Sequence, residues 1–111
     1  MKIMHLIKTT TGATWALKQI TELIKYGCDI HVVLPDSKNL YQKYIDAGAT
    51  VHILNVDIAQ GRRPLQLAKS LHAFRKLVDN IHPDIVHSHF VGTTLFMRIA
   101  LKDHKVKRIF Q

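Results

Sequence analysis

The sequence has only one cysteine and no long apolar run, and each of these features excludes a class of protein. Cys28 cannot form a disulfide within the chain, which excludes a disulfide-stabilised domain. No stretch approaches the roughly 18 apolar residues of a membrane-spanning helix. The first apolar run, Ile3–Ile7, is interrupted by His5 and ends at Lys8, short of the roughly 7–15 residues of a signal-peptide core. We therefore expect a cytoplasmic protein whose membrane contact is at most peripheral, at the inner face.

Acidic and aromatic residues are also scarce. Eight Asp and Glu stand against sixteen Lys and Arg, giving a net charge of +8, and aromatic residues make up 7%. Such a charge attracts anions, but a nucleic-acid interface needs its cations in one stripe with stacking aromatics. The cations are instead spread along the chain: Arg62, Arg63, Arg75, Lys76, Lys102, Lys105, Lys107 and Arg108. We expect no nucleic-acid partner; an anionic membrane leaflet, a phosphorylated substrate or a plainly solvated basic surface each fits this charge.

Short apolar runs alternate with amphipathic segments along the whole chain. Helical spacing of apolar residues predicts four helices, near 16–24, 40–45, 64–81 and 92–100. Five β-rich runs separate and flank them: Ile3–Ile7, Ile30–Leu34, Val51–Leu54, Ile85–His89 and Val106–Phe110. This alternation predicts an α/β fold, a Rossmann-like doubly wound parallel sheet of strand order 3-2-1-4-5. At 111 residues we expect one domain over 1–111.

Ligands of such sheets bind where the strand order reverses, at the carboxyl ends of strands one and four. After strand one come Thr10, Thr11 and Gly12, whose hydroxyls and flexible backbone at a helix start suit a phosphate. One glycine stands where a dinucleotide fingerprint has three, so that motif is absent. The alternative is structural, with Thr11 serving only as the N-cap of the helix.

After strand four come His89, Phe90 and Gly92. Alternation along the strand puts His87 and His89 on one face, with His87 the deeper and His89 at the tip. We expect His87 to be buried and hydrogen-bonded, and His89 to meet a sugar hydroxyl or a phosphate. A metal site needs a third ligand, and the sequence places none nearby, so we expect no metal.

Five segments form a distinctive series: Met1–Ile7, the loop with Gly12, Lys25–Ile30, Ala47–Val51 and, most specific, Pro83-Asp84-Ile85-Val86-His87-Ser88-His89. In order and spacing this series resembles the start of retaining GT-B-type glycosyltransferases of capsular polysaccharide and lipopolysaccharide biosynthesis. The resemblance implies two Rossmann-like domains, of which the first mainly holds the acceptor and the second the nucleotide sugar. The donor is then a substrate, and the resemblance implies neither a cofactor nor a metal.

By the same resemblance, Thr10, Thr11 and Gly12 border the donor diphosphate and acceptor, while His89, Phe90 and Gly92 line the acceptor side. The chain departs from the family in having one glycine in the first loop and no acidic residue at the following helix start. It carries no catalytic residue of its own, because the family's functional histidine lies in the loop after strand five.

The sequence stops at Gln111, in or just after the fifth strand. We therefore expect an incomplete domain, truncated after strand five, that is inactive alone. We also expect it to self-associate through Ile109, Phe110 and the helix carrying Leu95 and Ile99. The alternative is a standalone Rossmann-like or flavodoxin-like domain that binds a ligand or regulates another protein.

Overall fold

The computed structural model describes residues 1–59 and 64–110, and within these ranges strands and helices alternate. The elements are β1 (Lys2–Leu6), α1 (Thr14–Lys25), β2 (Asp29–Leu34), α2 (Tyr41–Asp46), β3 (Thr50–Ile53), α3 (Pro64–Ile81), β4 (Ile85–Ser88), α4 (Val91–Ala100) and β5 (Lys107–Phe110). Arg62 and Arg63, two of the cations noted above, lie outside the described residues. None of the described helices is both long and apolar enough to span a membrane.

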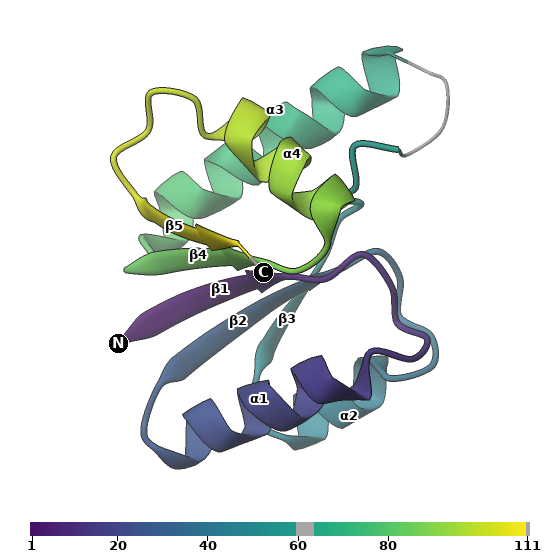
Figure 1. Ribbon diagram of the computed structural model, residues 1–111, viewed down its shortest axis with the longest axis vertical. Helices are drawn as coiled ribbons and strands as arrows, with labels where there is room; N and C mark the ends of the chain where they lie inside the picture. Colours follow the sequence, from purple (N-terminus) through teal and green to yellow (C-terminus); the bar gives the residue numbers. More distant parts are fainter. Residues whose placement is uncertain (60–63, 111) are drawn as a thin grey trace.

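The sheet is parallel throughout, with the order β3-β2-β1-β4-β5. This confirms the predicted Rossmann-like α/β fold and its strand order. Helices α1 and α2 cover one face of the sheet, and α3 and α4 cover the other (Figure 1). Strand β1 lies at the centre, where β2 and β4 pair with its two edges. The switch point therefore falls between the ends of β1 and β4, as expected.

The sheet separates two apolar cores. On the side of α3 and α4, Met4 and Leu6 of β1 pack with Phe74 and Phe96, whose ring centroids lie 5.7 Å apart. On the side of α1 and α2, the alternate β1 residues Ile3 and Ile7 pack in a second cluster. Because successive side chains of a strand point to opposite faces, β1 contributes to both cores.

Glycine ends the first helix, as the sequence predicts. Gly27 has φ +89°, a left-handed conformation that carries no Cβ clash in glycine. The amide of Gly27 donates to the Ile24 carbonyl at 2.9 Å, and the amide of Cys28 donates to the Leu23 carbonyl at 3.1 Å. These bonds satisfy carbonyls at the end of α1 and turn the chain directly into β2.

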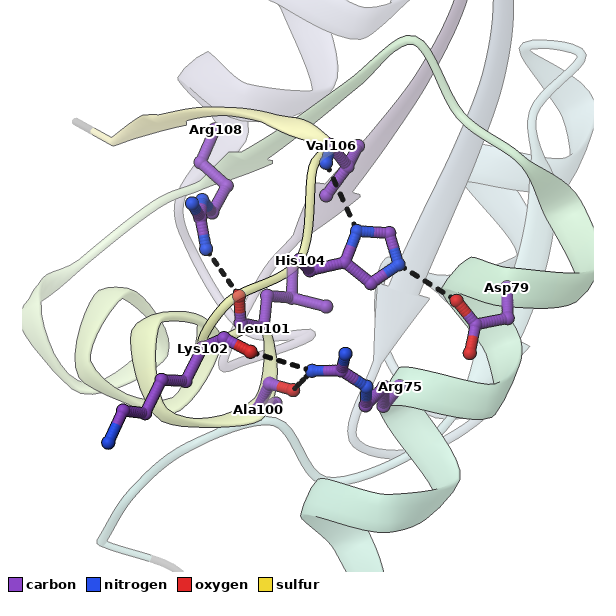
Figure 2. A network of polar contacts seen from close by, with 8 residues as sticks. All are labelled: Arg75, Asp79, Ala100, Leu101, Lys102, His104, Val106 and Arg108. Atoms are coloured by element: carbon purple, nitrogen blue, oxygen red, sulfur yellow. Dashed lines mark hydrogen bonds and ion pairs between the residues drawn. The ribbon is translucent and has the colours of Figure 1, made fainter.

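Two arginines bind carbonyls at the end of α4 (Figure 2). One terminal nitrogen of Arg75, from α3, donates to the carbonyls of Ala100 at 3.1 Å and Lys102 at 3.0 Å. Arg108, from β5, donates to the Leu101 carbonyl. The C-terminal end of a helix carries a partial negative charge, so a cation placed there is stabilising. Arg75 and Arg108, two of the excess basic residues, therefore have a structural role in joining α3, α4 and β5.

His104 adds a further contact between these elements (Figure 2). Its Nδ1 accepts a hydrogen bond from the Val106 amide at 3.0 Å, and its Nε2 lies 2.8 Å from Oδ1 of Asp79 on α3. Since Nδ1 is the acceptor, the neutral ring carries its proton on Nε2 and donates it to the carboxylate. The turn before β5 is thereby tied to α3.

Candidate functional site

The loop after β1 is tied to the loop after β2. Thr10 is buried, and its Oγ1 donates to Oδ1 of Asp36 at 2.8 Å. This bond, together with one from the Lys38 amide, lowers the pKa of the Asp36 carboxyl. Asn39 Nδ2 donates to Thr11 Oγ1 at 2.8 Å. Of the three predicted residues here, Thr10 thus has an internal partner, and only Thr11 and Gly12 are exposed.

Thr11 does not cap α1, so the structural alternative considered for it is wrong. The N-cap position is Ala13, in a left-handed conformation at φ 52°, and no side chain caps the helix within the described part of the chain. Gly12 also has positive φ, at +70°, so two consecutive left-handed residues separate Thr11 from the helix. The positive end of α1 consequently lacks a side-chain acceptor.

Three histidines lie together on the face of the sheet that α1 covers. The parallel register places His5 of β1 beside His87 of β4, and alternation places His89 on the same face. The rings of His87 and His89 are stacked with centroids 4.3 Å apart, which confirms that they share a face. His5 Nδ1 lies 2.9 Å from His89 Nε2, a hydrogen-bonded pair.

The expected depths of His87, on β4, and His89, directly after it, are reversed. His89 is fully buried, whereas His87 is only partly buried. Trp15 of α1 covers His89, with ring centroids 5.3 Å apart, while His87 lies in register with Ile109 of β5, itself 40% exposed. Burial prevents direct contact between the His89 ring and a sugar hydroxyl or a phosphate in this conformation.

The structure brings a third imidazole, that of His5, to His87 and His89, a neighbour that the sequence did not place there. One ring nitrogen from each of His5, His87 and His89 lies within 4.8 Å of the others. His5 is 82 positions before His87, so spacing along the chain gives no hint of the contact. The predicted pairing of strands one and four was the signal that could have found it, because it puts these two positions side by side.

Burial favours the neutral forms of His5 and His89. The pKa of His5 is lowered to about 3, first by burial and then by repulsion from His89 and His87. The pKa of His89 is lowered to about 4, by burial and then by His87. Two ring nitrogens, Nε2 of His5 and Nδ1 of His89, are buried without a hydrogen-bond partner among the described residues. His5 and His89 thus offer neutral imidazoles with unused hydrogen-bonding capacity.

Beside the buried histidines lies a partly open aromatic surface. Trp15, 45% exposed, and Phe90 lie with ring centroids 5.7 Å apart, and Lys8 Nζ is 5.0 Å from the Phe90 ring centre. Phe90 adopts φ 81° and ψ 155°, a conformation that costs a bulky residue on the order of 1–3 kcal/mol. We call Lys8, Trp15 and Phe90 the aromatic edge. It presents two tilted aromatic rings and a cation at the switch point.

Gly92 has a packing role in the first turn of α4. A Cβ added there would lie 2.1 Å from Oδ1 and 2.9 Å from Cγ of Asp57. The Ile58 amide donates to the Gly92 carbonyl at 3.2 Å, which fixes the same close approach. Glycine at this position therefore lets the segment after β3 reach the positive end of α4, where the Asp57 carboxylate is favourable.

Comparison with protein families gives one match. The model of a family described as "Glycosyl transferase 4-like" matches residues 2–110. None of the curated proteins matches the chain in sequence.

Comparison with solved structures extends the likeness in fold. MurG from Acinetobacter baumannii is 12% identical with a TM-score of 0.77, over 98% of this chain and 34% of that one. A glycosyltransferase from Rickettsia africae ESF-5 is 12% identical with a TM-score of 0.77, over 98% and 28%. The C-terminal domain of the PF1911 hydrogenase from Pyrococcus furiosus is 17% identical with a TM-score of 0.71, over 99% and 89%. The chain thus spans about a third of the first two proteins.

Proposed function

We propose that this chain, which belongs to the glycosyl transferase 4-like family, is the acceptor-side domain of a retaining GT-B glycosyltransferase. The enzyme would transfer a sugar from a nucleotide sugar to a glycan or a lipid-linked acceptor, such as those of polysaccharide biosynthesis. The observation that carries the proposal is the aromatic edge, Lys8, Trp15 and Phe90, at the carboxyl ends of β1 and β4. Ligands of doubly wound sheets bind at this switch point.

The chemistry of this edge suits a glycan. The 45% exposed ring of Trp15, beside the partly buried Phe90, matches the apolar C–H face of a sugar ring, and Lys8 adds a cation for an anionic group of the acceptor. Exposed Thr11 and Gly12 lie before the uncapped positive end of α1, which favours a diphosphate. The donor is a substrate in this proposal, and no resident cofactor takes part in the transfer.

The isolated chain is expected to bind acceptor without transferring sugar. Trp15 is the sole tryptophan and lies at the aromatic edge, so its fluorescence reports on binding there. Glycan and lipid-linked acceptors are titrated into the chain, and nucleotide sugars are added to assay turnover. We expect a saturable fluorescence change, weakened about tenfold or more by Phe90→Ala, and no turnover.

Phe110→Ala is the matched control, because Phe110 is an exposed phenylalanine on β5 that packs under Arg98 instead. It should leave the titration unchanged. Turnover above buffer would show that the chain alone is active. A response to free nucleotides or flavins with none to acceptors would favour a standalone ligand-binding domain.

A second surface of the chain fits self-association and peripheral membrane contact. Leu95 and Ile99 of α4 and Ile109 and Phe110 of β5 are all exposed, as the sequence predicts. Val91, Leu95, Arg98 and Phe110 are among the residues that line a groove between α4 and β5. Apolar side chains with neighbouring cations favour either a second copy of the chain or an anionic leaflet. We include both contacts in the proposal.

Sedimentation velocity is expected to show oligomers that grow with concentration. Leu95→Gln should reduce them, because it removes apolar area from the groove without touching the core. Leu65→Gln is the control, since Leu65 is more exposed and lies on α3, outside the residues that line the groove. Adding anionic vesicles should shift wild-type protein to the membrane pellet. A monomer at high concentration would contradict self-association.

A further inference from the structure

We propose that His5, His87 and His89 form a binding site for one divalent transition-metal ion of the zinc type. The inference rests on the juxtaposition of three imidazoles on adjacent strands, and it does not depend on the proposed function. One ring nitrogen of each residue lies within 4.8 Å of the other two. Three histidines leave a fourth coordination position for water or another oxygen ligand.

The spacing is close to what coordination needs. Zinc–nitrogen bonds of roughly 2.0–2.1 Å in a tetrahedral site place two ligand nitrogens about 3.3 Å apart. No two ligand nitrogens of the set are more than 4.8 Å apart. The widest separation would have to close by roughly 1.5 Å, which rotation of a side chain supplies. The strand backbones, held in register, can stay in place.

The hydrogen bonding of the buried pair supplies the second observation. A neutral imidazole has one N–H and one lone pair, so the His5–His89 bond uses a proton from one ring and a lone pair from the other. The nitrogens left over, His5 Nε2 and His89 Nδ1, are buried and without partners among the described residues. In either tautomer one of them holds an unused lone pair. An unsatisfied buried polar atom is costly, and an ion bound through that lone pair would relieve that cost, with the His5–His89 hydrogen bond exchanged for the second metal–nitrogen bond.

The all-imidazole ligand set also indicates which metals would bind. Imidazole suits zinc, copper, nickel and iron, whereas calcium and magnesium require oxygen ligands. Part of the His87 side is open, so an ion has a route into the cluster that the fully buried His5 and His89 do not provide. The site would tie β1 to β4 at the centre of the sheet.

The chain contains a matched pair that should not form such a site. His31 Nδ1 lies 2.9 Å from His52 Nε2, and the two rings are stacked at 5.2 Å between β2 and β3. Over residues 1–59 and 64–110 this pair belongs to no group of three metal-binding side chains. It reproduces the ring contact of His5 and His89 without the third imidazole.

The test is a titration of the purified, untagged chain with Zn²⁺ and with Co²⁺. Wild-type protein should bind one equivalent and give the intense visible spectrum of tetrahedral Co²⁺. His87→Gln should weaken binding beyond the roughly 10–100-fold that loss of a group supporting a ligand costs. It is the main variant because His87 is only partly buried, and circular dichroism checks its fold. His5→Gln should have the same effect, and His52→Gln should leave affinity within about twofold.

Three results would overturn the proposal. The first is wild-type protein that binds less than one equivalent or gives only the weak spectrum of octahedral Co²⁺. The second is equal affinity in wild-type and folded His87→Gln protein, which would assign the binding to scattered surface histidines. The third is a loss in His52→Gln as large as that in His87→Gln.

Discussion

Lowering the pH from 7 to 4.5 is expected to destabilise the metal-free domain progressively. The folded-state pKa values of His5 and His89, about 3 and about 4, lie below the ordinary value of 6.5. Between these limits the unfolded chain binds protons that the folded chain excludes, so stability is greatest above pH 6.5 and is lost as the pH falls. Each histidine contributes on the order of 1 kcal/mol per pH unit. His52, whose pKa is also lowered by burial and by His31, acts in the same direction.

Urea unfolding at pH 7, 5.5 and 4.5, with a chelator present, measures this effect. His89→Gln should flatten the pH dependence because glutamine has no proton to gain, even if the variant is less stable at pH 7. His72→Gln is the control, since His72 is exposed on α3 and should leave the slope unchanged. A wild-type free energy of unfolding that stays constant from pH 6.5 to 4.5 would contradict the prediction.

Phe74→Ala should destabilise the domain strongly and lower its thermal unfolding temperature. Phe74 is fully buried on α3 and packs edge to face on Phe96 of α4, in the core between these helices and the sheet. Truncating a buried phenylalanine costs roughly 3–5 kcal/mol, a large part of the roughly 5–15 kcal/mol total stability of a domain. Thermal and urea denaturation followed by circular dichroism provide the measurement.

Phe110→Ala is the control for this core variant, since its ring is 58% exposed on β5. We expect it to cost less than about 1 kcal/mol, because little apolar area leaves the interior. Equal destabilisation by the two substitutions would show that the core between α3, α4 and the sheet does not hold the fold together as described.

The sequence predicts the architecture well because the architecture rests on local signals. Short apolar runs mark the strands, apolar residues at helical spacing mark the helices, and Gly27 marks the end of α1. Short connections and right-handed crossovers then leave few strand orders, and 3-2-1-4-5 is the one observed. The match of the glycosyl transferase 4-like family model likewise spans the segments whose resemblance the sequence carries.

The candidate site is predicted less well because it depends on contacts between distant residues. His5 meets His89 only when β1 and β4 pair, and His89 is buried only because Trp15 covers it. Thr11 does not cap α1 because Gly12 and Ala13 both adopt left-handed backbone conformations and move the N-cap position to Ala13. The positions of the threonines in the sequence do not reveal these conformations. Arg75 and the α4 carbonyls come together in the same non-local way.

The central position of β1 has a consequence for synthesis on the ribosome. β1 is the first strand to emerge, β2 can pair with one of its edges early, and β4 reaches the other edge only after roughly 80 further residues. At about 5–20 residues per second, that second edge stays unpaired for several seconds. During this time the nascent chain exposes an apolar strand that can pair with another chain, so chaperone binding near the ribosome exit should matter most before β4 is made.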